Sequence, residues 1–516
     1  EGGAFRPRGI YINRGKNVGV QGVSVKNTPS WNVHPIFSEN MKFIDIYLES
    51  HKDSPNTDYK IKVDEFVFDL KTLNESASIN VRDFGAVGDG KHDDTMMLQA
   101  AINSVPKNGT LIIPQGTYYT LPLFLKSDIT IELKKGATLL GNTDRKLYPI
   151  LPPFVYHNDG TKQELGHWEG VPQPIFASII TGLYIENVNI IGEGVIDANA
   201  NNSDWWDFPI TPEGGAFRPR GIYINRGKNV GVQGVSVKNT PSWNVHPIFS
   251  ENMKFIDIYL ESHKDSPNTD GCNPESCTHV EIIGVKFSVG DDCIAIKSGK
   301  MYPDMNKPVP MVDLTIRNCH MAYGHGAVVL GSEMSGGIKD LYVSRCLFEH
   351  TDRGLRIKTR RGRGRDSVVD NVNFSNIYMD HVLAPLTINM FYNCVDPDKH
   401  SEYVWSKEAL PVDERTPLLG NFTFKDMVCD NVHAAAGFFY GLPEETIKSV
   451  TIDNIHFTMA EDAQAFKPIM MDHLDNTTKL GIVAHNVDKL TITNSTVKGQ
   501  LGEEVVMSGV KDYTRN

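Results

Sequence analysis

The chain has 516 residues, of which 40% are hydrophobic and 22% charged, and it carries a formal net charge of −12 at pH 7. This acidic balance argues against nucleic acid as a partner, because phosphates are bound by clustered lysine and arginine. No apolar run approaches the about 20 residues of a membrane-spanning helix, so a membrane is not expected as a partner either.

The chain begins with a copy of a later segment. Residues 1–58 match residues 213–270 at every position, and both copies end in the hexapeptide DSPNTD. Natural internal repeats diverge while keeping their hydrophobic positions, so complete identity indicates a recent or artificial copy. The segment is too short to bury a core alone. We therefore interpret 1–58 as surplus, and expect it to be poorly packed or to lie against one end of the body as extra strands.

A second short region separates this copy from the main body. Residues 59–78 open with YKIKVDEFVFDL, whose alternation of apolar and charged residues is typical of a strand. Because it follows the copy abruptly, we interpret it as the remnant of a small preceding β domain or as a linker. The main body, a single domain, is expected at 79–516.

The cysteines bear on location and on metal binding. There are seven, an odd and sparse number that predicts buried thiols rather than a disulfide framework. With no recognisable signal peptide, this favours the cytoplasm over secretion. Cys272 and Cys277 have nearly the spacing of metal ligands, but no second Cys or His pair of the zinc type accompanies them. No metal and no other cofactor is predicted.

One short helix is expected, within residues 80–104. Residues 93–95 (Asp-Asp-Thr) can cap it, and Met97, Ala100 and Ala101 then fall on one face at three-to-four spacing. Such a helix would cover the open end of a stack of strands. The preceding DFGAVGDG is rich in glycine but lacks the Lys-Ser/Thr of a phosphate-binding loop.

From about residue 125 onward one pattern recurs, a short polar lead followed by alternating apolar residues, as in NVNIIGEGVID and HVEIIGVKF. Each unit reads as strand, turn, strand, with Asn and Gly at the corners. This repeat predicts an all-β parallel β-helix, whose coils bury their inner face only by stacking. Jelly-roll and sandwich folds would show hairpin turns at shorter spacing. The positions taken as equivalent, 25 to 34 residues apart, are Val230, Phe255, Val280, Leu314, Leu341 and Val372.

Acidic residues recur at this coil spacing. Asp270 precedes Asp291 and Asp292 by 21 and 22 residues, and His325 follows Asp292 by 33. Neighbouring coils rise by about 4.8 Å, so these side chains converge on one face. Close carboxylates repel, which leaves an acid beside a base, as hydrolysis of a glycosidic bond requires. Taken singly, each aspartate is equally consistent with a turn residue or a calcium ligand.

Four motifs carry a family resemblance. NTDG at 268–271, GDDC at 290–293, GHG at 324–326 and RIK at 356–358 occur in this order. Over residues 80–510 the chain resembles the polygalacturonases, glycoside hydrolase family 28. The resemblance implies a right-handed parallel β-helix that hydrolyses α-1,4-linked galacturonate with inversion, and a pectic poly- or oligosaccharide as partner.

The resemblance also implies roles for single residues. By motif position, Asp291 would be the general acid, while Asp270 and Asp292 would hold and deprotonate the attacking water. His325 would tune these carboxylates through hydrogen bonds. Asn268, in the first motif, is expected to contact the substrate. In the first copy the hexapeptide has no partner motifs, so only the second copy is expected to be catalytic.

The cations of the fourth motif suit an acidic sugar. Arg356 can bind a carboxylate with two hydrogen bonds, and Lys358 can add a point charge. Salt bridges to the catalytic aspartates are the alternative for both. The arginines that follow are predicted to steer a polyanion toward the cleft, or else to be solvated loop charges; they are Arg360, Arg361, Arg363 and Arg365.

Three further residues are weighed as substrate contacts. His246, in PSWNVHP, lies 24 residues before Asp270, about one coil away, and WxxHP stretches resemble those of bacterial family members. We expect it to contact a sugar; a packed structural histidine is the alternative. Glu333 and Tyr392 are placed in later loops that line the groove.

The mode of action is predicted from the same resemblance. TRRGRG, GSEMSGG and the long insertion at 145–180 resemble bacterial exo-acting members, and such an insertion would wall off one end of the groove. A rhamnogalacturonan or xylogalacturonan hydrolase of the same fold is the first alternative. A pectate lyase would need calcium, and a non-enzymatic polysaccharide-binding β-helix would tolerate Asp291→Asn.

Overall fold

The computed structural model describes residues 9–26, 33–36, 38–44, 47–49, 77–207, 215–302, 307–394 and 401–516. The chain forms two compact units, Glu1–Ser76 and Ala77–Asn516. The end of the first copy, including Asp58, and positions 59–76 of the predicted linker lie outside the described residues. Within these ranges no helix is long and apolar enough to cross a membrane.

In the part of the first unit that the structure describes, the strands form three parallel pairs. β1 (Ile10–Asn13) pairs with β4 (Val33–Ile36), β2 (Gly19–Gln21) with β5 (Lys42–Ile44), and β3 (Ser24–Lys26) with β6 (Tyr47–Glu49). Ile10 lies opposite Val33, just as Ile222 lies opposite Val245 in the second copy. The shared sequence therefore forms the same strand pairs twice. That the segment is surplus stays a prediction.

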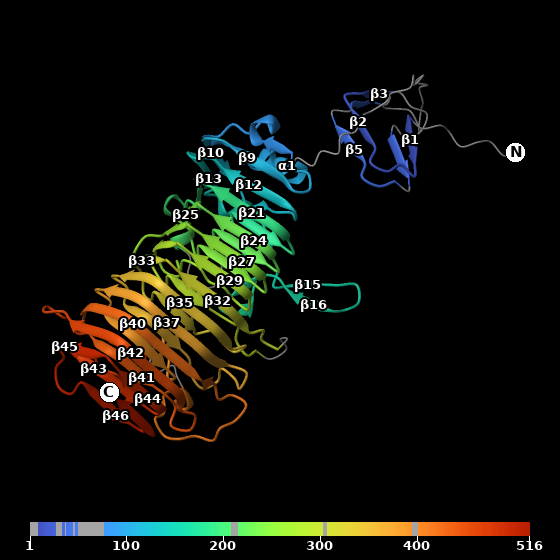
Figure 1. Ribbon diagram of the computed structural model, residues 1–516. Coiled ribbons are helices and arrows are strands. Elements are labelled where there is room, and N and C mark those ends of the chain that lie inside the picture. Colours follow the sequence, from blue (N-terminus) through green and yellow to red (C-terminus); the bar gives the residue numbers. More distant parts are fainter. Residues whose placement is uncertain are drawn as a thin grey trace. The chain divides into compact units, whose positions relative to one another are not determined.

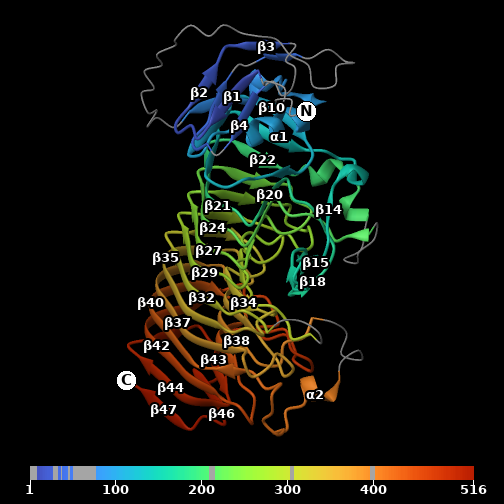
Figure 2. The ribbon, with the colours of Figure 1, turned by 90° about the vertical axis from the view of Figure 1, so that its right-hand side faces the viewer.

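The second unit is a right-handed parallel β-helix, which confirms the predicted fold (Figures 1 and 2). Its largest sheet is parallel throughout and contains 24 described strands. They are β7 (Ser78–Asn80), β8 (Asp89–Asp93), β9 (Gly109–Ile113), β10 (Gly116–Thr120), β12 (Ile129–Leu133), β13 (Ala137–Gly141), β21 (Glu186–Gly192), β22 (Val195–Asp197), β24 (Lys228–Gln233), β25 (Ser236–Lys238), β27 (Glu251–Ile256), β28 (Tyr259–Glu261), β29 (Thr278–Ile283), β30 (Lys286–Ser288), β32 (Met311–Arg317), β33 (His320–Tyr323), β35 (Ile338–Glu349), β37 (Val368–Asp380), β39 (Leu418–Leu419), β40 (Asn421–Val432), β42 (Ile447–Met459), β44 (Val487–Thr493), β45 (Thr496–Lys498) and β47 (Asp512–Arg515).

Two smaller parallel sheets complete the coils and carry the site. The first contains β11 (Leu123–Phe124), β20 (Ile180–Leu183), β23 (Ile222–Asn225) and β26 (Val245–Ile248). The second contains β31 (Ile294–Ile296), β34 (Val328–Gly331), β36 (Arg353–Lys358), β38 (Ala384–Asn389), β41 (Ala435–Tyr440), β43 (Leu480–His485) and β46 (Val505–Ser508). Bridges from Cys272 and Glu275 to β26 and to the β31 coil join them into one surface. We call this surface the site sheet.

Strand register corrects one predicted position. Val230 lies opposite Met253, and Met253 lies opposite Val280. Phe255 instead aligns with Val232 on one side, so the predicted column was wrong by two residues at this coil. Alternation allows the error, because residues two apart on a strand point to the same side and both are buried here.

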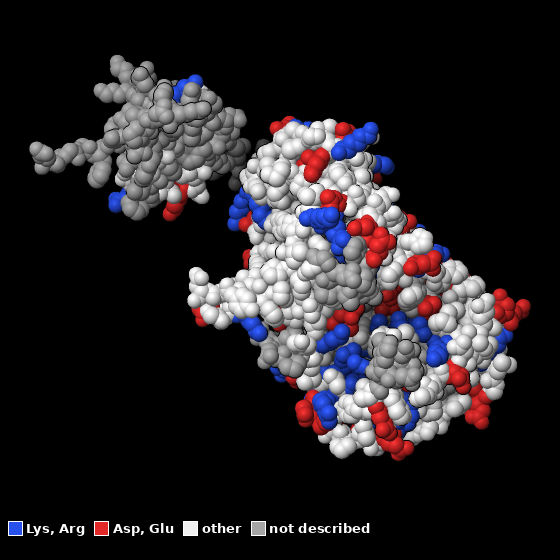
Figure 3. Space-filling view, turned by 180° about the vertical axis from the view of Figure 1, so that it is seen from behind, with Lys and Arg blue, Asp and Glu red and all other residues white. Residues whose placement is uncertain are grey.

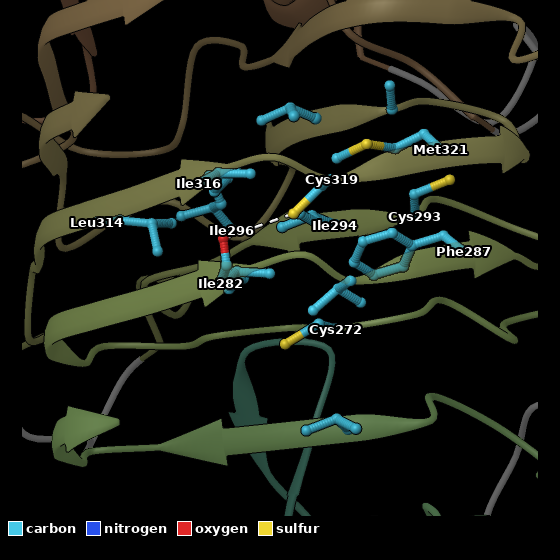
Figure 4. Close-up of a cluster of buried hydrophobic side chains, with 14 of the residues drawn as sticks. Cys272, Ile282, Phe287, Cys293, Ile294, Ile296, Leu314, Ile316, Cys319 and Met321 are labelled. Atoms are coloured by element: carbon cyan, nitrogen blue, oxygen red, sulfur yellow. Dashed lines mark hydrogen bonds between the residues drawn. The ribbon is translucent and has the colours of Figure 1, made fainter. Parts of the chain in front are cut away.

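The interior is apolar and includes the thiols. Figure 4 shows Cys272, Cys293 and Cys319 among Phe287, Ile316 and other inward side chains. All seven cysteines are free and six are buried, which confirms the predicted buried thiols, with Cys394 as the exposed exception. Cys319 Sγ donates to the Ile282 carbonyl oxygen at 3.5 Å.

Helix α1 (Thr95–Ser104) lies at the start of the β-helix, as predicted. It buries Leu98, Ala101 and Ile102, while Ala100 is exposed. The predicted face was therefore shifted, because the apolar stripe is centred on Leu98 and Ala101 rather than on Ala100. The short helices that remain are α2 (Glu402–Trp405), η1 (Val81–Phe84), η2 (Arg145–Leu147), η3 (Ala200–Asn202) and η4 (Trp205–Asp207).

The insertion at 145–180 forms antiparallel pairs beside the site sheet. β14 (Ile150–Leu151) pairs with β19 (Ile175–Phe176), β15 (Phe154–Tyr156) with β16 (Lys162–Glu164), and β17 (His167–Trp168) with β18 (Val171–Pro172). A second apolar cluster joins the insertion to β23 and β26, because Leu165 and Trp168 share it with Tyr223 and Ile248. The insertion thus covers the outer face of the first four coils of the site sheet.

Candidate active site

A cleft of about 650 Å³ lies on the outer face of the site sheet. On the face shown in Figure 3, Lys and Arg side chains gather around a hollow together with a few acidic ones. The cleft brings together predicted residues from all four motifs and several others. Its lining includes Asn268, Asp270, Asp291, Asp292, His325, Glu333, Arg356, Lys358, Arg360, Arg363 and Tyr392.

Parallel register explains why the motifs meet. Ile294 lies opposite Val328, and Val328 lies opposite Leu355. Asp291 and His325 each precede these paired residues by three positions, so they occupy the same corner on successive coils. The His325 amide also donates to the Asp291 carbonyl oxygen at 2.9 Å. Asp270 comes from the preceding coil, where Gly271 N donates to the Asp292 carbonyl oxygen at 3.0 Å.

The aspartates have opposite electrostatic surroundings. Burial, followed by the neighbouring Asp291 carboxylate, raises the pKa of Asp270 to about 8. Asp292 is equally buried, but Lys358 and Arg356 outweigh that burial and hold its pKa well below its usual range. At neutral pH the cleft therefore contains a protonated carboxyl group beside an ionised one. That is the separation that acid and base catalysis on one bond requires.

His325 lies at the edge of this cluster, with about half of its side chain exposed. Its Nδ1 is 3.2 Å from Asp291 Oδ1. This hydrogen bond raises the pKa of His325 against the opposing effect of burial. The histidine is thus placed to bond the carboxylate of Asp291, as the motif implied.

Arg356 and Lys358 contact Asp292 directly. Arg356 Nη1 is 3.0 Å from Asp292 Oδ1, and Lys358 Nζ is 2.8 Å from Asp292 Oδ2. The salt-bridge alternative therefore describes both cations. Both also line the cleft, so contact with a sugar carboxylate stays a prediction.

The arginine run after RIK divides into two groups. Arg360 and Arg363 line the cleft. Arg361 is buried, donates to both carboxylate oxygens of Glu444 and also bonds three backbone carbonyls. Arg365 pairs with Glu445. The prediction that all four steer a polyanion is wrong for Arg361, because this residue is buried and its charge is paired with Glu444.

His246 is placed away from the cleft. It is fully buried, and its Nε2 lies 3.0 Å from Glu275 Oε2. Its neighbour Val245 aligns with Cys272, so His246 lies opposite Asn273 rather than Asp270. Burial lowers the pKa of His246 to about 3, so the ring is neutral. The expected sugar contact is not supported, and the packed alternative describes this residue.

Asn268 and Tyr392 both line the cleft. Asn268 accepts a hydrogen bond of 2.8 Å from Arg218 Nη2, which fixes the carbonyl side of its amide. Tyr392 lies under Lys358, whose Nζ is 5.6 Å from the ring centroid. Both positions agree with the placement predicted for them.

Sequence reasoning missed Lys297 and Lys300. Lys297 is buried beside Glu333 at 2.8 Å, and Lys300 lies 3.6 Å from the same carboxylate. Burial disfavours the charge of Lys297, but Glu333 and Asp270 outweigh it and raise its pKa. A signal was available, because Lys297 follows the inward Ile294 and Ile296 in strict alternation and so had to face the cleft.

The insertion forms one wall of the cleft. Glu169, at the tip of the β17–β18 hairpin, lines the cleft and lies 3.8 Å from Lys300. The rings of Trp168 and Trp243 stack on each other with centroids 5.6 Å apart, and the Arg220 guanidinium lies beside both, 4.9 and 4.7 Å from their centroids. These stacked groups hold the hairpin against the sheet.

Comparisons with known proteins settle the family. The glycosyl hydrolases family 28 model matches residues 114–404. A probable polygalacturonase of Vitis vinifera is 30% identical over 397 residues, which are 75% of this chain and 75% of that protein. This chain belongs to glycosyl hydrolases family 28.

Bacterial members of the family are also similar. An exo-poly-alpha-D-galacturonosidase of Dickeya chrysanthemi is 26% identical over 390 residues, 64% of this chain and 62% of that protein. A solved family 28 exopolygalacturonase of Yersinia enterocolitica superposes with a TM-score of 0.67 at 21% identity, covering 86% of this chain and 78% of that one. For an exopolygalacturonase of Thermotoga maritima the TM-score is 0.65 at 25% identity, with coverage of 84% and 92%.

The resemblance inferred from the four motifs is thereby confirmed at the level of family and fold. As a family 28 member the chain is a glycoside hydrolase, and the cleft with its three aspartates is where its sequence motifs converge. Among the described residues no group of three or more His, Cys, Asp or Glu side chains is arranged to hold a metal ion.

Proposed function

We propose that this family 28 enzyme hydrolyses α-1,4 bonds of polygalacturonate and its oligomers, with inversion, and removes units from one end of the chain. The observation that carries the proposal is the cleft, in which three aspartates lie among six lysine and arginine side chains. Those cations are Lys297, Lys300, Arg356, Lys358, Arg360 and Arg363. A galacturonan chain has a carboxylate on every unit and requires such surroundings, whereas a neutral polysaccharide does not.

The aspartates divide the chemistry among them. Asp292 is held ionised by Arg356 and Lys358, so it suits the role of base toward water. Burial and the neighbouring Asp291 carboxylate raise the pKa of Asp270, so Asp270 is the protonated group beside the ionised Asp292. Asp291 is the side chain that His325 contacts, and we assign it the general acid. In that role Asp291 gives a proton to the leaving oxygen.

Action at one end is supported by the wall. The hairpin that ends in Glu169 lines one side of the cleft together with Trp243, and the contacts of Arg220 with Trp168 and Trp243 support it. Ion pairs of Lys300 with Glu169 and with Glu333 join this hairpin to the later coil and hold the wall in place. A chain end fits there better than the middle of a polymer.

Proton NMR of the purified chain with trigalacturonate tests this proposal. The expected result is β-anomeric monogalacturonate as the first product, with none formed by Asp291→Asn. Asp257→Asn, an exposed aspartate at another coil corner, is the matched control and is expected to keep full activity.

Each other outcome selects another mechanism. An α-anomeric product would contradict inversion, and a mixture of internal fragments from longer oligomers would contradict action at one end. Cleavage of xylogalacturonan or rhamnogalacturonan in preference to polygalacturonate would change the substrate while keeping the machinery. An unsaturated product that absorbs in the ultraviolet would indicate a lyase.

A further inference from the structure

A second cavity lies beside the cleft and has no role in the mechanism above. Its volume is about 220 Å³, and three histidines from successive coils contribute to it. We call it the distal pocket. It is lined by His350, Thr351, Asp352, His381, Leu383 and His433.

The distal pocket continues the row of catalytic corners. Val328 lies opposite Leu355, and Leu355 lies opposite Leu386. Three positions before these stand His325, Asp352 and Leu383, on the same corner as Asp291. Coils rise by about 4.8 Å, so the coils of His350 and His381 lie roughly 10 and 14 Å beyond Asp291 along the axis. A sugar chain of a few units bound at the cleft reaches this distance, whereas a disaccharide does not.

The straight path along the site sheet is covered beyond the cleft. Arg353 donates from Nε to the Pro468 carbonyl oxygen at 3.1 Å and from Nη2 to that of Lys467 at 2.7 Å. Asn389 Nδ2 donates to the Met470 carbonyl oxygen at 2.8 Å, and Met470 itself lines the cleft. Residues 467–470 therefore cross the outer face of β36 and β38. A longer substrate has to leave over the coil corners, where the distal pocket lies.

The histidines are prepared to donate hydrogen bonds. The ring of His381 lies 5.1 Å from that of His350 and 6.4 Å from that of His433, centroid to centroid. His433 Nδ1 accepts from the Gln464 amide at 3.1 Å, which leaves the ring proton on Nε2. His381 Nδ1 lies 2.9 Å from Asp380 Oδ1, which orients that ring. Burial raises the pKa of Asp352. Its carboxyl group is therefore ionised less readily and repels an approaching anion less.

We propose that the distal pocket is a subsite for a further acidic sugar unit of the same galacturonan chain, whose carboxylate accepts hydrogen bonds from His350 and His381. The rings of both histidines are exposed, so a sugar can approach them. This inference rests on the proposed function, because it requires a polymer of uronic acid in the cleft. It predicts that long substrates bind more tightly because they contact the distal pocket, which short substrates do not reach.

Initial rates on a length series test the subsite. The double variant His350→Ala/His381→Ala is compared with the intact chain on di-, tri-, tetra- and pentagalacturonate. We expect kcat/KM on pentagalacturonate to fall by about tenfold, chiefly through KM, while digalacturonate is cleaved as before. Lys instead of Ala at position 381 keeps a hydrogen-bond donor there, so His381→Lys is expected to restore most of the loss. His456→Ala removes an exposed histidine from β42 and is the matched control, without effect at any length.

Two results would overturn the subsite. Equal losses on all lengths would indicate a folding defect, and no loss on any length would show that the distal pocket is not used. If the intact chain cleaved none of the oligomers, the proposed function itself would fail. Calorimetry with pentagalacturonate then tests the distal pocket separately, by comparing Asp291→Asn with the triple variant that also carries His350→Ala and His381→Ala. Tighter binding by Asp291→Asn supports the subsite. Equal binding by the two proteins, or no binding by either, refutes it.

Discussion

Residues 1–58 and 213–270 have the same sequence and differ only in their neighbours. Both copies form the same parallel pairs in the same register. Tyr11 is nevertheless 49% exposed, whereas its counterpart Tyr223 is completely buried. Val23 is 38% exposed, and its counterpart Val235 is buried. Local sequence thus determines the strand pairing of a coil, while adjacent coils and the insertion determine what it buries.

The same contrast applies to chemistry. Asp270 acquires its electrostatic surroundings from Asp291, Asp292 and Lys297, all of which come from the following coil. Asp58 shares the preceding 57 residues but is followed by a different sequence. One coil therefore provides the carboxyl group, and the charged side chains of the following coil determine its chemical properties.

The largest expected effect separates the copies by activity. Asp270→Asn is expected to lower kcat on polygalacturonate by about 10²- to 10⁴-fold, the usual contribution of a general acid or base. Asp58→Asn changes the same residue in the same preceding sequence and is expected to leave kcat unchanged. Steady-state rates of reducing-end release measure both. Comparable losses in the two variants would show that the first copy also takes part in catalysis.

The next effect separates them by stability. Tyr223→Ala removes a fully buried ring whose hydroxyl donates to the Leu165 carbonyl oxygen, and we expect it to lower the free energy of unfolding by about 3 to 5 kcal/mol. Tyr11→Ala is expected to change it by less than about 0.5 kcal/mol, as for other surface substitutions. Urea unfolding monitored by circular dichroism compares the two midpoints. A large effect of Tyr11→Ala would mean that the first copy is packed as tightly as the second.

A pH effect follows from the raised pKa of Asp270, about 8 compared with a normal value near 3.8. Between these values the folded chain binds a proton that the unfolded chain releases, so this group's contribution to stability is full below pH 3.8 and is lost as the pH rises through 8. Asp270→Asn removes the dependence, and at pH 9 the variant should be more stable than the parent by on the order of 5 kcal/mol.

Thermal unfolding at pH 4 and pH 9 measures this difference, which should vanish at the lower pH. Asp58→Asn serves again as the control and should follow the parent at both pH values. If the difference in stability between the parent and Asp270→Asn were the same at pH 4 and pH 9, Asp270 would be ionised like an ordinary surface aspartate.

The features that could be predicted from the sequence are the local ones, and those that could not depend on other parts of the molecule. The β-helix and the meeting of the motifs depend on coil length and alternation, which are local, and both were predicted. The His246 environment depends on the insertion packing over its coil, and the cover at 467–470 depends on contacts more than 100 residues apart, such as Arg353 to Pro468. Neither feature can be deduced from the spacing of the motifs. Lys297 is the exception, since alternation would have placed it in the cleft.

The smallest expected effect comes from removing the first unit altogether. Residues 77–516 form their own compact unit with a continuous core from Val81 to Val497, so this body should fold without the copy. We expect kcat on polygalacturonate to stay within about twofold and the unfolding midpoint to be unchanged, since a non-contributing segment adds no buried area. Rates and circular dichroism of the shortened chain check this. A clear loss of stability would mean that the first copy supports the body, and the surplus interpretation of residues 1–58 would then have to be abandoned.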